Sequence, residues 1–426
     1  MKIYCAGIGG IGLSAYASLQ HARGNEVMGS DRCESVLLHS LRSHGIPVTL
    51  DQSGRGIPSE IDLFVYSEAI PIDAPERVRA RAIGVRQMNY FEALGDLSRD
   101  ARVIAVCGTH GKSSTTGMAA QLLMECGKDP TVVVGTKLPL LGGLNYRQGK
   151  SNIFLLEACE YRRNFLRLSP DIILMTTVDG DHFDAFESLE DYQRAYSEFL
   201  QKLPKNGVVI THGSDPDCAR VVHAWGGRWM DADIFPLPAL SIPGRHMQEN
   251  ARLVLGLADI LHIPREHALQ ALLRYTGGWR RMEVKGVFGD DILVIDDYGH
   301  HPREIRSTLE ALRGANPLRR LICVFQPHTH DRSIKLYADF LSAFSHVDSL
   351  ILADVYDARS DIERDMLDMY RFTEDIGRES KVPVRYGGSL AQVEQYLRSG
   401  VLSSGDLLVC MGAGDITDLA ERMVAN

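Results

Sequence analysis

The sequence lacks any apolar run approaching the roughly 20 residues that a helix needs to cross a bilayer. It also has no apolar signal-peptide segment near its start, where Met1 and Lys2 lead directly into a strand-like run. We therefore expect a cytoplasmic protein with no membrane partner.

Positive charge is not in excess, since 46 Lys and Arg residues stand against 55 Asp and Glu residues, for a formal net charge of -9. Such a chain has no general attraction for nucleic acid, so we expect no nucleic-acid partner, and any anionic ligand must meet donors that are arranged locally. The eight cysteines include no CxxC pair and several lie in apolar runs. This pattern predicts reduced, buried thiols.

Short β-rich apolar runs alternate with helical patterns along the whole chain, which predicts α/β domains built on parallel sheets. Clear examples of such runs are Ile3–Ala6, Val103–Val106, Ile172–Met175 and Ile292–Ile295. A chain of 426 residues has room for about two to four domains. The points where motifs restart predict three domains, at residues 1–100, 101–282 and 283–426.

The first motif is a glycine turn, Gly7-Ile-Gly9-Gly10-Ile-Gly12, which follows the first predicted strand and opens a helix. In this context the glycines let a pyrophosphate approach backbone amides at a helix N-terminus. Asp31 comes 19 positions after Gly12, just beyond the second predicted strand, where it can accept a ribose hydroxyl. The same turn also serves strand-helix packing without any ligand, and it does not by itself name the nucleotide.

The second motif, Gly108-Thr-His-Gly-Lys-Ser-Ser114, stands between the predicted strand Val103–Val106 and a predicted helix at Thr115–Cys126. That order is typical of a phosphate-binding loop, in which backbone amides cradle phosphates and a lysine reaches the terminal ones. The motif predicts an ATP site in which Lys112 binds phosphate and the Ser113 hydroxyl binds Mg²⁺. The loop is one residue shorter than the full Walker pattern, which requires a glycine where Val106 stands.

Acidic residues follow two further predicted strands, at Glu157 and in the run from Asp179 to Asp184 that contains His182. Because ligands of an open parallel sheet lie beyond the carboxyl ends of its strands, these side chains and Ser113 are expected to converge. Hard oxygen ligands suit Mg²⁺. His182 taken alone is equally well explained as part of a surface loop or helix cap.

These motifs, in this order, resemble the Mur ligase family, the ATP-dependent amide-forming enzymes of bacterial cell-wall synthesis. The resemblance covers the whole chain and includes further motifs at Pro243–His246, Arg280–Glu283, Asp296–Pro302, Gln326–His328 and Asp354–Arg359. It implies a Rossmann-like first domain, a central P-loop ATPase domain with a mostly parallel sheet, and a Rossmann-like third domain. Within the family, the chain is most similar to members that join L-alanine to UDP-N-acetylmuramate.

The resemblance also implies roles for individual residues, with ATP and Mg²⁺ as cofactors and with UDP-N-acetylmuramate and L-alanine as substrates of a monomer or homodimer. The residues implied in ATP binding are Gly108, Thr109, His110, Gly111, Lys112, Ser113, Ser114, Asn250, Arg281 and Asp297. Those implied in metal binding are Ser113, Glu157 and His182. Those implied in binding the UDP-sugar or the amino acid are Gly9, Gly10, Ile11, Gly12, Asp31, Ser67, Ile70, His301, His328, Arg332 and Arg359.

Four places depart from the usual family pattern and bear on the amino-acid specificity. Cys159 stands where the family commonly has aspartate, and Met247 and Thr177 stand where it has asparagine. The run that begins at Thr329 and ends at Arg332 stands where an extra arginine and a tyrosine are customary. With these changes, Arg332 or Arg359 would supply the missing charge.

Three alternatives remain open from the sequence. A recycling ligase that attaches a whole murein tripeptide to the same UDP-sugar would share the ATP site. A non-catalytic protein that binds UDP-sugar and ATP would also keep the motifs, although Lys112, Glu157 and His182 together favour an enzyme. A nicotinamide-dependent dehydrogenase would use only the first glycine turn and leave the second motif unexplained.

Overall fold

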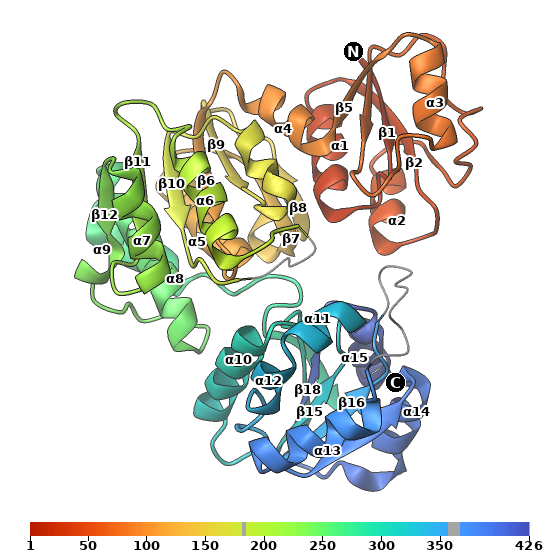
Figure 1. Ribbon diagram of the computed structural model, residues 1–426, viewed down its shortest axis with the longest axis vertical. Helices are drawn as coiled ribbons and strands as arrows, with labels where there is room; N and C mark the ends of the chain where they lie inside the picture. The colour runs from red at the N-terminus through yellow and green to blue at the C-terminus, as the bar shows by residue number, and fades with distance from the viewer. Residues whose placement is uncertain (181–184, 357–366, 426) are drawn as a thin grey trace. The chain divides into compact units, whose positions relative to one another are not determined.

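The computed structural model describes residues 1–180, 185–356 and 367–425, and Figure 1 shows their course. Two compact units make up the chain. The first contains Met1–Ala239 and Glu249–Tyr275, and the second contains Leu240–Gln248 and Thr276–Asn426. The described residues form three separate sheets, two in the first unit and one in the second, which agrees with the predicted α/β class. The predicted division at residues 100 and 282 is not tested by these two units and stays a prediction.

The first sheet has five parallel strands in the order β3-β2-β1-β4-β5. The strands are β1 Lys2–Ala6, β2 Glu26–Ser30, β3 Val48–Thr49, β4 Leu63–Tyr66 and β5 Arg86–Asn89. The helices are α1 Ile11–Ala22, α2 Val36–Ser43, α3 Pro75–Ala82 and α4 Tyr90–Ser98. Alternate residues of β1 face opposite sides, so Ile3 and Cys5 pack with residues of α1, α2 and α4, while Tyr4 packs with Phe64 and with Ala80 of α3.

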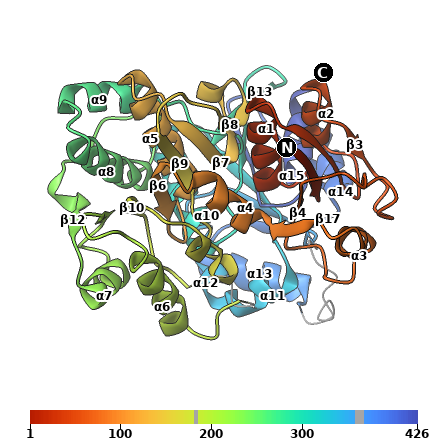
Figure 2. The same cartoon turned by 90° about the horizontal axis from the view of Figure 1, so that it is seen from above.

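The second sheet has seven strands in the order β12-β11-β10-β6-β9-β7-β8. They are β6 Arg102–Cys107, β7 Thr131–Leu138, β8 Leu144–Arg147, β9 Ile153–Glu157, β10 Ile172–Met175, β11 Val208–Thr211 and β12 Trp229–Asp231. The helices are α5 Lys112–Glu125, α6 Leu189–Leu200, α7 Pro216–Trp225, α8 Arg245–Ile260 and α9 Arg265–Leu273, with a short 3₁₀ segment η2 at Tyr161–Arg167. Figure 2 shows α5, α8 and α9 on one side of this sheet and α6 and α7 on the other.

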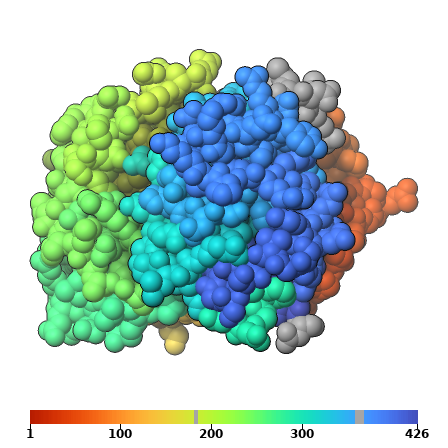
Figure 3. Space-filling model, turned by 90° about the horizontal axis from the view of Figure 1, so that it is seen from below, coloured from red at the N-terminus to blue at the C-terminus, as the bar shows by residue number. Residues whose placement is uncertain are grey.

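The third sheet has six strands in the order β13-β14-β18-β15-β16-β17. They are β13 Glu283–Phe288, β14 Ile292–Asp297, β15 Leu321–Phe325, β16 Ser349–Ala353, β17 Val384–Gly388 and β18 Leu407–Met411. The helices are α10 Pro302–Ala315, α11 His330–Lys335, α12 Tyr337–Leu341, α13 Met369–Ser380, α14 Leu390–Tyr396 and α15 Ile416–Val424. In Figure 3 the side chains of this unit, teal to blue, form a closely packed surface.

The structure differs from the sequence-based expectations in three respects. Strands β8 and β13 are antiparallel edge strands, whereas the pattern predicted parallel sheets. Helix α5 begins at Lys112 instead of Thr115, because the phosphate-loop motif runs directly into its first turn. Of the cysteines, Cys33 is exposed and Cys126 and Cys159 are only partly buried, while the other five are buried and all eight are free thiols.

The described residues contain no helix that is both long enough and apolar enough to span a bilayer.

Candidate active site

The loop between β6 and α5 is held by the two residues that follow β10. Gly108 has φ 134°, and a side chain there would overlap the Thr176 hydroxyl, so only glycine fits. The Thr109 amide donates to the Thr177 carbonyl at 2.9 Å, and the His110 amide donates to the Thr177 hydroxyl at 3.1 Å. The loop therefore begins in a fixed backbone conformation at the carboxyl end of β6.

Gly111 ends the loop in the left-handed region, with φ 79°, immediately before α5. A Cβ atom at this position would lie 2.6 Å from Oδ1 of Asn250 on α8, so the absence of a side chain lets the asparagine approach the loop. Asn250, which the family resemblance implies in nucleotide binding, thus lies against the predicted phosphate loop. Ser113 and Ser114 are buried in the first turn of α5.

The ammonium group of Lys112 folds back over its own loop. Its Nζ donates to the carbonyl oxygens of Gly108 at 2.5 Å and Thr109 at 3.1 Å, and to Oε1 of Glu160 at 2.9 Å. Burial by itself lowers the pKa of Lys112, but the charge of Glu160 and its hydrogen bond, together with the nearby Cys159 and Glu157, outweigh that effect and raise the pKa well above its usual value. Lys112 therefore carries a permanent positive charge at the loop.

Glu157 lies at the carboxyl end of β9, directly beside β6, where it pairs in register with Val106. On its other side the Glu157 side chain lies against Gly135 of β7. A Cβ atom added to Gly135 would lie 2.6 Å from Oε2 of Glu157, so only glycine leaves room for the carboxylate. The strand order β6-β9-β7 therefore puts this carboxylate at the same edge of the sheet as the phosphate loop. His182, the other predicted metal ligand of this region, lies outside the described residues.

Asp179, which follows β10, and Tyr192, which lies on α6, complete the surroundings of the loop. Oδ2 of Asp179 lies 3.3 Å from Nε2 of His110, and the Thr109 hydroxyl donates to the Asp179 carbonyl at 2.8 Å. The Tyr192 hydroxyl lies 3.0 Å from the Thr109 hydroxyl and donates to Glu160 at 3.3 Å. The loop, β10 and α6 are therefore joined by one polar network.

The first glycine turn is braced by Asp31. The Gly9 amide donates to Oδ2 of Asp31 at 2.7 Å, and the Gly7 amide donates to the Ser30 carbonyl at 2.8 Å. Gly10 caps α1, which begins at Ile11. Asp31, predicted as a partner of a ribose, thus already supports the turn with one of its oxygens.

Two other predicted substrate residues lie against the same turn. A Cβ atom on Gly7 would meet Cβ of Ser67 at 3.0 Å and Cδ1 of Ile70 at 3.3 Å. The Ile70 amide donates to the Ser67 carbonyl at 2.9 Å, which closes a tight turn after β4. At Gly12 a Cβ atom would lie 2.8 Å from the ring of Tyr90, so α1 packs closely on α4. The turns after β1 and β4 therefore form one surface at the carboxyl end of the first sheet.

The first sheet also has a direct tie to the second. Asn145 on β8 is buried and donates through Nδ2 to the Ile11 carbonyl at 2.6 Å and to the Ser14 hydroxyl at 3.1 Å. Glu68 bridges Asn89, at 3.2 Å, and Asn164, at 3.0 Å. Contacts between α1 and the hairpin β7-β8 thus position the first glycine turn relative to the second sheet.

In the second unit, Asp297 lies at the end of β14. It accepts from the backbone amides of Met282 and Gly299, each at 2.8 Å. Burial raises the pKa of the Asp297 carboxyl to about 6, against the opposing charge of Arg281. Arg281 lies over the Tyr298 ring, with its guanidinium 5.1 Å from the ring centre.

The remaining predicted residues of this unit gather near the ends of β14 and β15. His301 caps α10, where its Nδ1 accepts from the Arg303 amide at 3.3 Å. A guanidinium nitrogen of Arg332 on α11 lies 3.1 Å from Nδ1 of His328. The His328 ring stacks on the Tyr356 ring, with 5.9 Å between the ring centroids. Arg359, which was expected to assist them, lies outside the described residues.

Sequence reasoning missed Glu160, Tyr192, Asn145 and Arg280 as members of these networks. Glu160 belongs to the same acidic run as Glu157, so its place after β9 offered a signal. Arg280 is buried and donates to the carbonyls of Gly412 and Gly414, which lie more than 130 positions away along the chain. No local pattern predicts that partnership.

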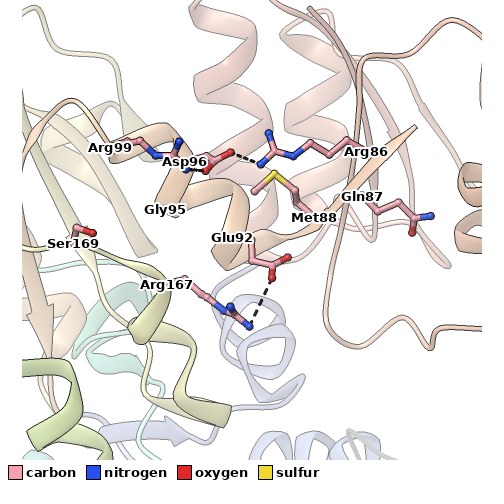
Figure 4. Close-up of a pocket in the computed structure, with 9 residues that line it drawn as sticks. All are labelled: Arg86, Gln87, Met88, Glu92, Gly95, Asp96, Arg99, Arg167 and Ser169. Atoms are coloured by element: carbon pink, nitrogen blue, oxygen red, sulfur yellow. Dashed lines mark hydrogen bonds and ion pairs between the residues drawn. The ribbon is translucent and has the colours of Figure 1, made fainter. Parts of the chain in front are cut away.

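A separate polar cavity of about 400 Å³ lies along β5, α4 and the loop after η2 (Figure 4). Its arginines are paired with its carboxylates, as Asp96 binds Arg86 at 2.8 Å and also Arg99, while Glu92 lies 3.7 Å from Arg167. None of the predicted site residues that the structure describes lines this cavity. The cavity marks a junction between the first two sheets and is distinct from the phosphate loop.

Comparison with known proteins identifies the family. Residues 2–102 match the description "Mur ligase family, catalytic domain", residues 106–231 "Mur ligase middle domain", and residues 280–414 "Mur ligase, glutamate ligase domain". The UDP-N-acetylmuramate–L-alanine ligase of Clostridium novyi is 34% identical over 453 residues, which covers 99% of this chain and 97% of that protein. A relative from Clostridium kluyveri with the same name is 35% identical over 450 residues, covering 99% of this chain and 97% of its own.

Solved structures show the same similarity. The UDP-N-acetylmuramate–alanine ligase of Thermotoga maritima superposes with a TM-score of 0.82 at 28% identity, over 100% of this chain and 98% of its own. A murein peptide ligase from Psychrobacter arcticus, at 20% identity and a TM-score of 0.74 over 100% of this chain and 98% of its own, shares the fold. The chain belongs to the Mur ligase family.

Proposed function

We propose that this protein is an ATP-dependent ligase that joins L-alanine to UDP-N-acetylmuramate in peptidoglycan precursor synthesis. Relatives that bear this name align with the chain over nearly its full length. The observation that carries the proposal is the loop at the end of β6, where Lys112 is held charged at the N-terminus of α5. A helix N-terminus with a lysine over a glycine loop is suited to ATP phosphates.

The reaction begins when the lactyl carboxylate of UDP-N-acetylmuramate attacks the γ-phosphorus of ATP, which releases ADP and forms an acyl phosphate. The enzyme assists this step by positioning the two substrates and by neutralising phosphate charge. Lys112 and the loop amides neutralise that charge. The neutral amine of L-alanine then attacks the acyl carbon, and the tetrahedral intermediate collapses to the amide and phosphate. Water must be excluded while the acyl phosphate exists.

Mg²⁺ fits the residues at the edge of the second sheet. Ser113 offers a hydroxyl and Glu157 a carboxylate, which are the oxygen ligands that Mg²⁺ prefers, and both follow neighbouring strands of one sheet. The family resemblance adds His182 as a further ligand. When bound, the ion neutralises phosphate charge, while Ser113 and Glu157 hold it beside the loop.

The substrate assignments follow the same proposal. Gly9, Gly12, Asp31, Ser67 and Ile70 would bind the UDP part at the surface formed by the turns after β1 and β4. Asn250, Arg281 and Asp297 would contact the nucleotide. His301, His328, Arg332 and Arg359 would hold the muramyl carboxylate and the amino acid. A cytoplasmic monomer or homodimer, with domain boundaries at residues 100 and 282, completes the proposal.

A measurement of phosphate release tests the proposed ligase activity. Purified protein is supplied with MgATP and UDP-N-acetylmuramate, and L-alanine, glycine, L-serine or the murein tripeptide is added in separate reactions. We expect release that requires both the UDP-sugar and L-alanine, and a product whose mass is that of the alanyl amide. Release with the tripeptide as acceptor and with none of the amino acids would assign the recycling activity. No release with any acceptor would refute the proposed ligase.

A further inference from the structure

Glu68 stands in the turn that follows β4, between Ser67 and Ile70, which the proposed function places beside the UDP part of the substrate. The Ser67 amide donates to the Ala6 carbonyl at 3.0 Å, and the Ile70 amide donates to the Ser67 carbonyl at 2.9 Å. The backbone of the turn is thus fixed to β1. A tie to the second sheet runs through the side chain of Glu68, which is only partly exposed.

Two buried amide groups meet the Glu68 carboxylate. Nδ2 of Asn89 donates to Oε1 at 3.2 Å, and Nδ2 of Asn164 donates to Oε2 at 3.0 Å. Asn89 is 8% exposed and Asn164 is 4% exposed, so water competes little for either amide. Asn89 ends β5 of the first sheet, whereas Asn164 belongs to η2, which follows β9 of the second sheet. Each oxygen of one carboxylate therefore binds a different part of the first unit.

Asn89 offers Glu68 only its amide hydrogens. Its Oδ1 accepts from the Glu92 amide at 2.8 Å, and its own backbone amide donates to Oε2 of Glu92 at 3.0 Å, which forms a capping box at the start of α4. Turning the side-chain amide over would lose the cap. Position 68 must therefore supply a hydrogen-bond acceptor to Asn89.

Asn164 is held in place from both sides along the chain. Arg162 and Arg163, which precede it, have φ values of 50° and 58°, in the left-handed region that non-glycine residues rarely adopt. Arg163 donates to two carboxylates of α6, each at 2.7 Å, and the buried Phe165 ring stacks on a phenylalanine of α6 with 4.5 Å between the ring centroids. These contacts with α6 maintain the unusual backbone of η2 and present the Asn164 amide to Glu68 at a fixed place.

The packing between the first two sheets does not depend on Glu68. A Cβ atom on Gly95 of α4 would overlap the Arg167 carbonyl oxygen, so α4 packs directly on the end of η2. Asn145 adds its hydrogen bonds from β8 to α1. Removal of the Glu68 carboxylate therefore releases the turn after β4 and leaves the junction of the sheets in place.

We propose that Glu68 is a positioning residue that ties the turn after β4 to the second sheet and thereby sets the affinity for the UDP-sugar. This inference rests on the proposed function, which places the UDP part at the surface formed by the turns after β1 and β4. Glu68 holds Ser67 and Ile70 where they meet the substrate. The phosphate loop follows β6 and is held by residues after β10, so nucleotide affinity does not depend on Glu68.

The test is calorimetric titration of the full chain with two ligands. UDP-N-acetylmuramate is added in the presence of Mg²⁺ and a non-hydrolysable ATP analogue, and MgADP is added alone in a separate titration. Glu68→Ala removes both hydrogen bonds to the turn and is expected to raise the Kd for the UDP-sugar about tenfold. The Kd for ADP should be unchanged. Glu60→Ala is the matched control, at an exposed glutamate just before β4, and should change neither Kd.

Glu68→Gln is expected to restore the affinity for the UDP-sugar to within about threefold, because glutamine keeps both hydrogen bonds. Its Oε1 accepts from Asn89, while its Nε2 donates to Oδ1 of Asn164 after the Asn164 amide turns over. Oδ1 of Asn164 accepts no hydrogen bond from any described residue, so this amide turns over without losing a partner. A purely structural loss would not be reversed for one ligand alone by this exchange.

Asn164→Ala tests the tie from its other end. It should raise the Kd for the UDP-sugar by a smaller factor than Glu68→Ala, because the bond from Asn89 remains. In the double variant Glu68→Ala with Asn164→Ala, the second change should add nothing, since its partner is already absent. Effects that multiply in the double variant would contradict the tie.

An unchanged Kd for the UDP-sugar in a folded Glu68→Ala protein, checked by circular dichroism, would overturn the inference, as would equal losses of affinity for both ligands. Should Glu68→Ala fail to fold, an unchanged Kd in Asn164→Ala would overturn it instead. If the unmodified protein does not bind UDP-N-acetylmuramate, the proposed function is refuted together with the inference. Equal binding by the unmodified protein and by Glu68→Ala refutes the inference alone, so the two failures are distinguishable.

Discussion

Replacing Lys112 with methionine should remove both a phosphate ligand and the counter-ion of a buried carboxylate. Glu160 is fully buried and its Oε1 lies 2.9 Å from Nζ of Lys112, so the change takes a positive charge away from a buried carboxylate. Removing one partner of a buried ion pair costs about 3–5 kcal/mol. We expect a loss of stability of that order for Lys112→Met at pH 8.

The loss should depend on pH with a definite sign. Burial disfavours the charged form of a carboxylate that has lost a cation, so the folded variant takes up a proton more readily than the unfolded chain does. The penalty is therefore present at pH 8 and shrinks as the pH falls. Urea unfolding at pH 8 and pH 5, followed by circular dichroism, measures the difference.

A second substitution separates folding from catalysis. In the double variant Lys112→Met with Glu160→Gln both members of the ion pair are replaced by uncharged side chains, so stability should return toward that of the unmodified protein. Phosphate release should stay reduced on the order of 10²-fold or more, because the ligand of the phosphates is still missing. Lys205→Met, at an exposed lysine of the same unit, is the control for both assays.

Two results would refute this reasoning. If Lys112→Met is as stable as the unmodified protein at pH 8, Glu160 is not its charged partner. If the double variant regains normal phosphate release, Lys112 does not bind phosphate.

Three further predictions concern the metal, the pH response and the tie between the sheets. Glu157→Gln should raise the Mg²⁺ concentration needed for half-maximal phosphate release by on the order of tenfold, and an unchanged Mg²⁺ titration would remove Glu157 from the metal site. Because the pKa of Asp297 is raised to about 6, its contribution to stability is most favourable at low pH and is lost as the pH rises from about 4 to 6. The difference in unfolding free energy between the unmodified protein and Asp297→Asn should therefore change across that range and be constant above it; a flat difference would contradict the raised pKa. Asn145→Ala removes the hydrogen bonds to Ile11 and Ser14. It should raise the KM for the UDP-sugar several-fold and leave the Kd for ADP unchanged. Equal effects on both ligands would argue against a role limited to the glycine turn.

Features that depend on neighbouring residues in the chain were correctly predicted. Gly108 and Gly111 adopt backbone angles that favour glycine, and the strand, loop and helix follow in the expected order. Likewise the run Ile172–Met175 forms a strand with the predicted bounds. These elements could be recognised because periodicity and glycine placement are local properties of the sequence.

Features that join distant parts of the chain were not predictable in this way. Glu160 meets Lys112 only because β9 lies beside β6, and Asn145 reaches Ile11 only because an antiparallel β8 closes the edge of the second sheet. The strand order that creates these contacts is set by the packing of all helices on both faces of the sheet, a balance to which every buried residue contributes. The sequence by itself thus determined the two glycine loops and the α/β class. Only the tertiary structure decided which charged side chains contact Lys112, because contacts between residues distant in the chain depend on spatial neighbours that no local spacing encodes.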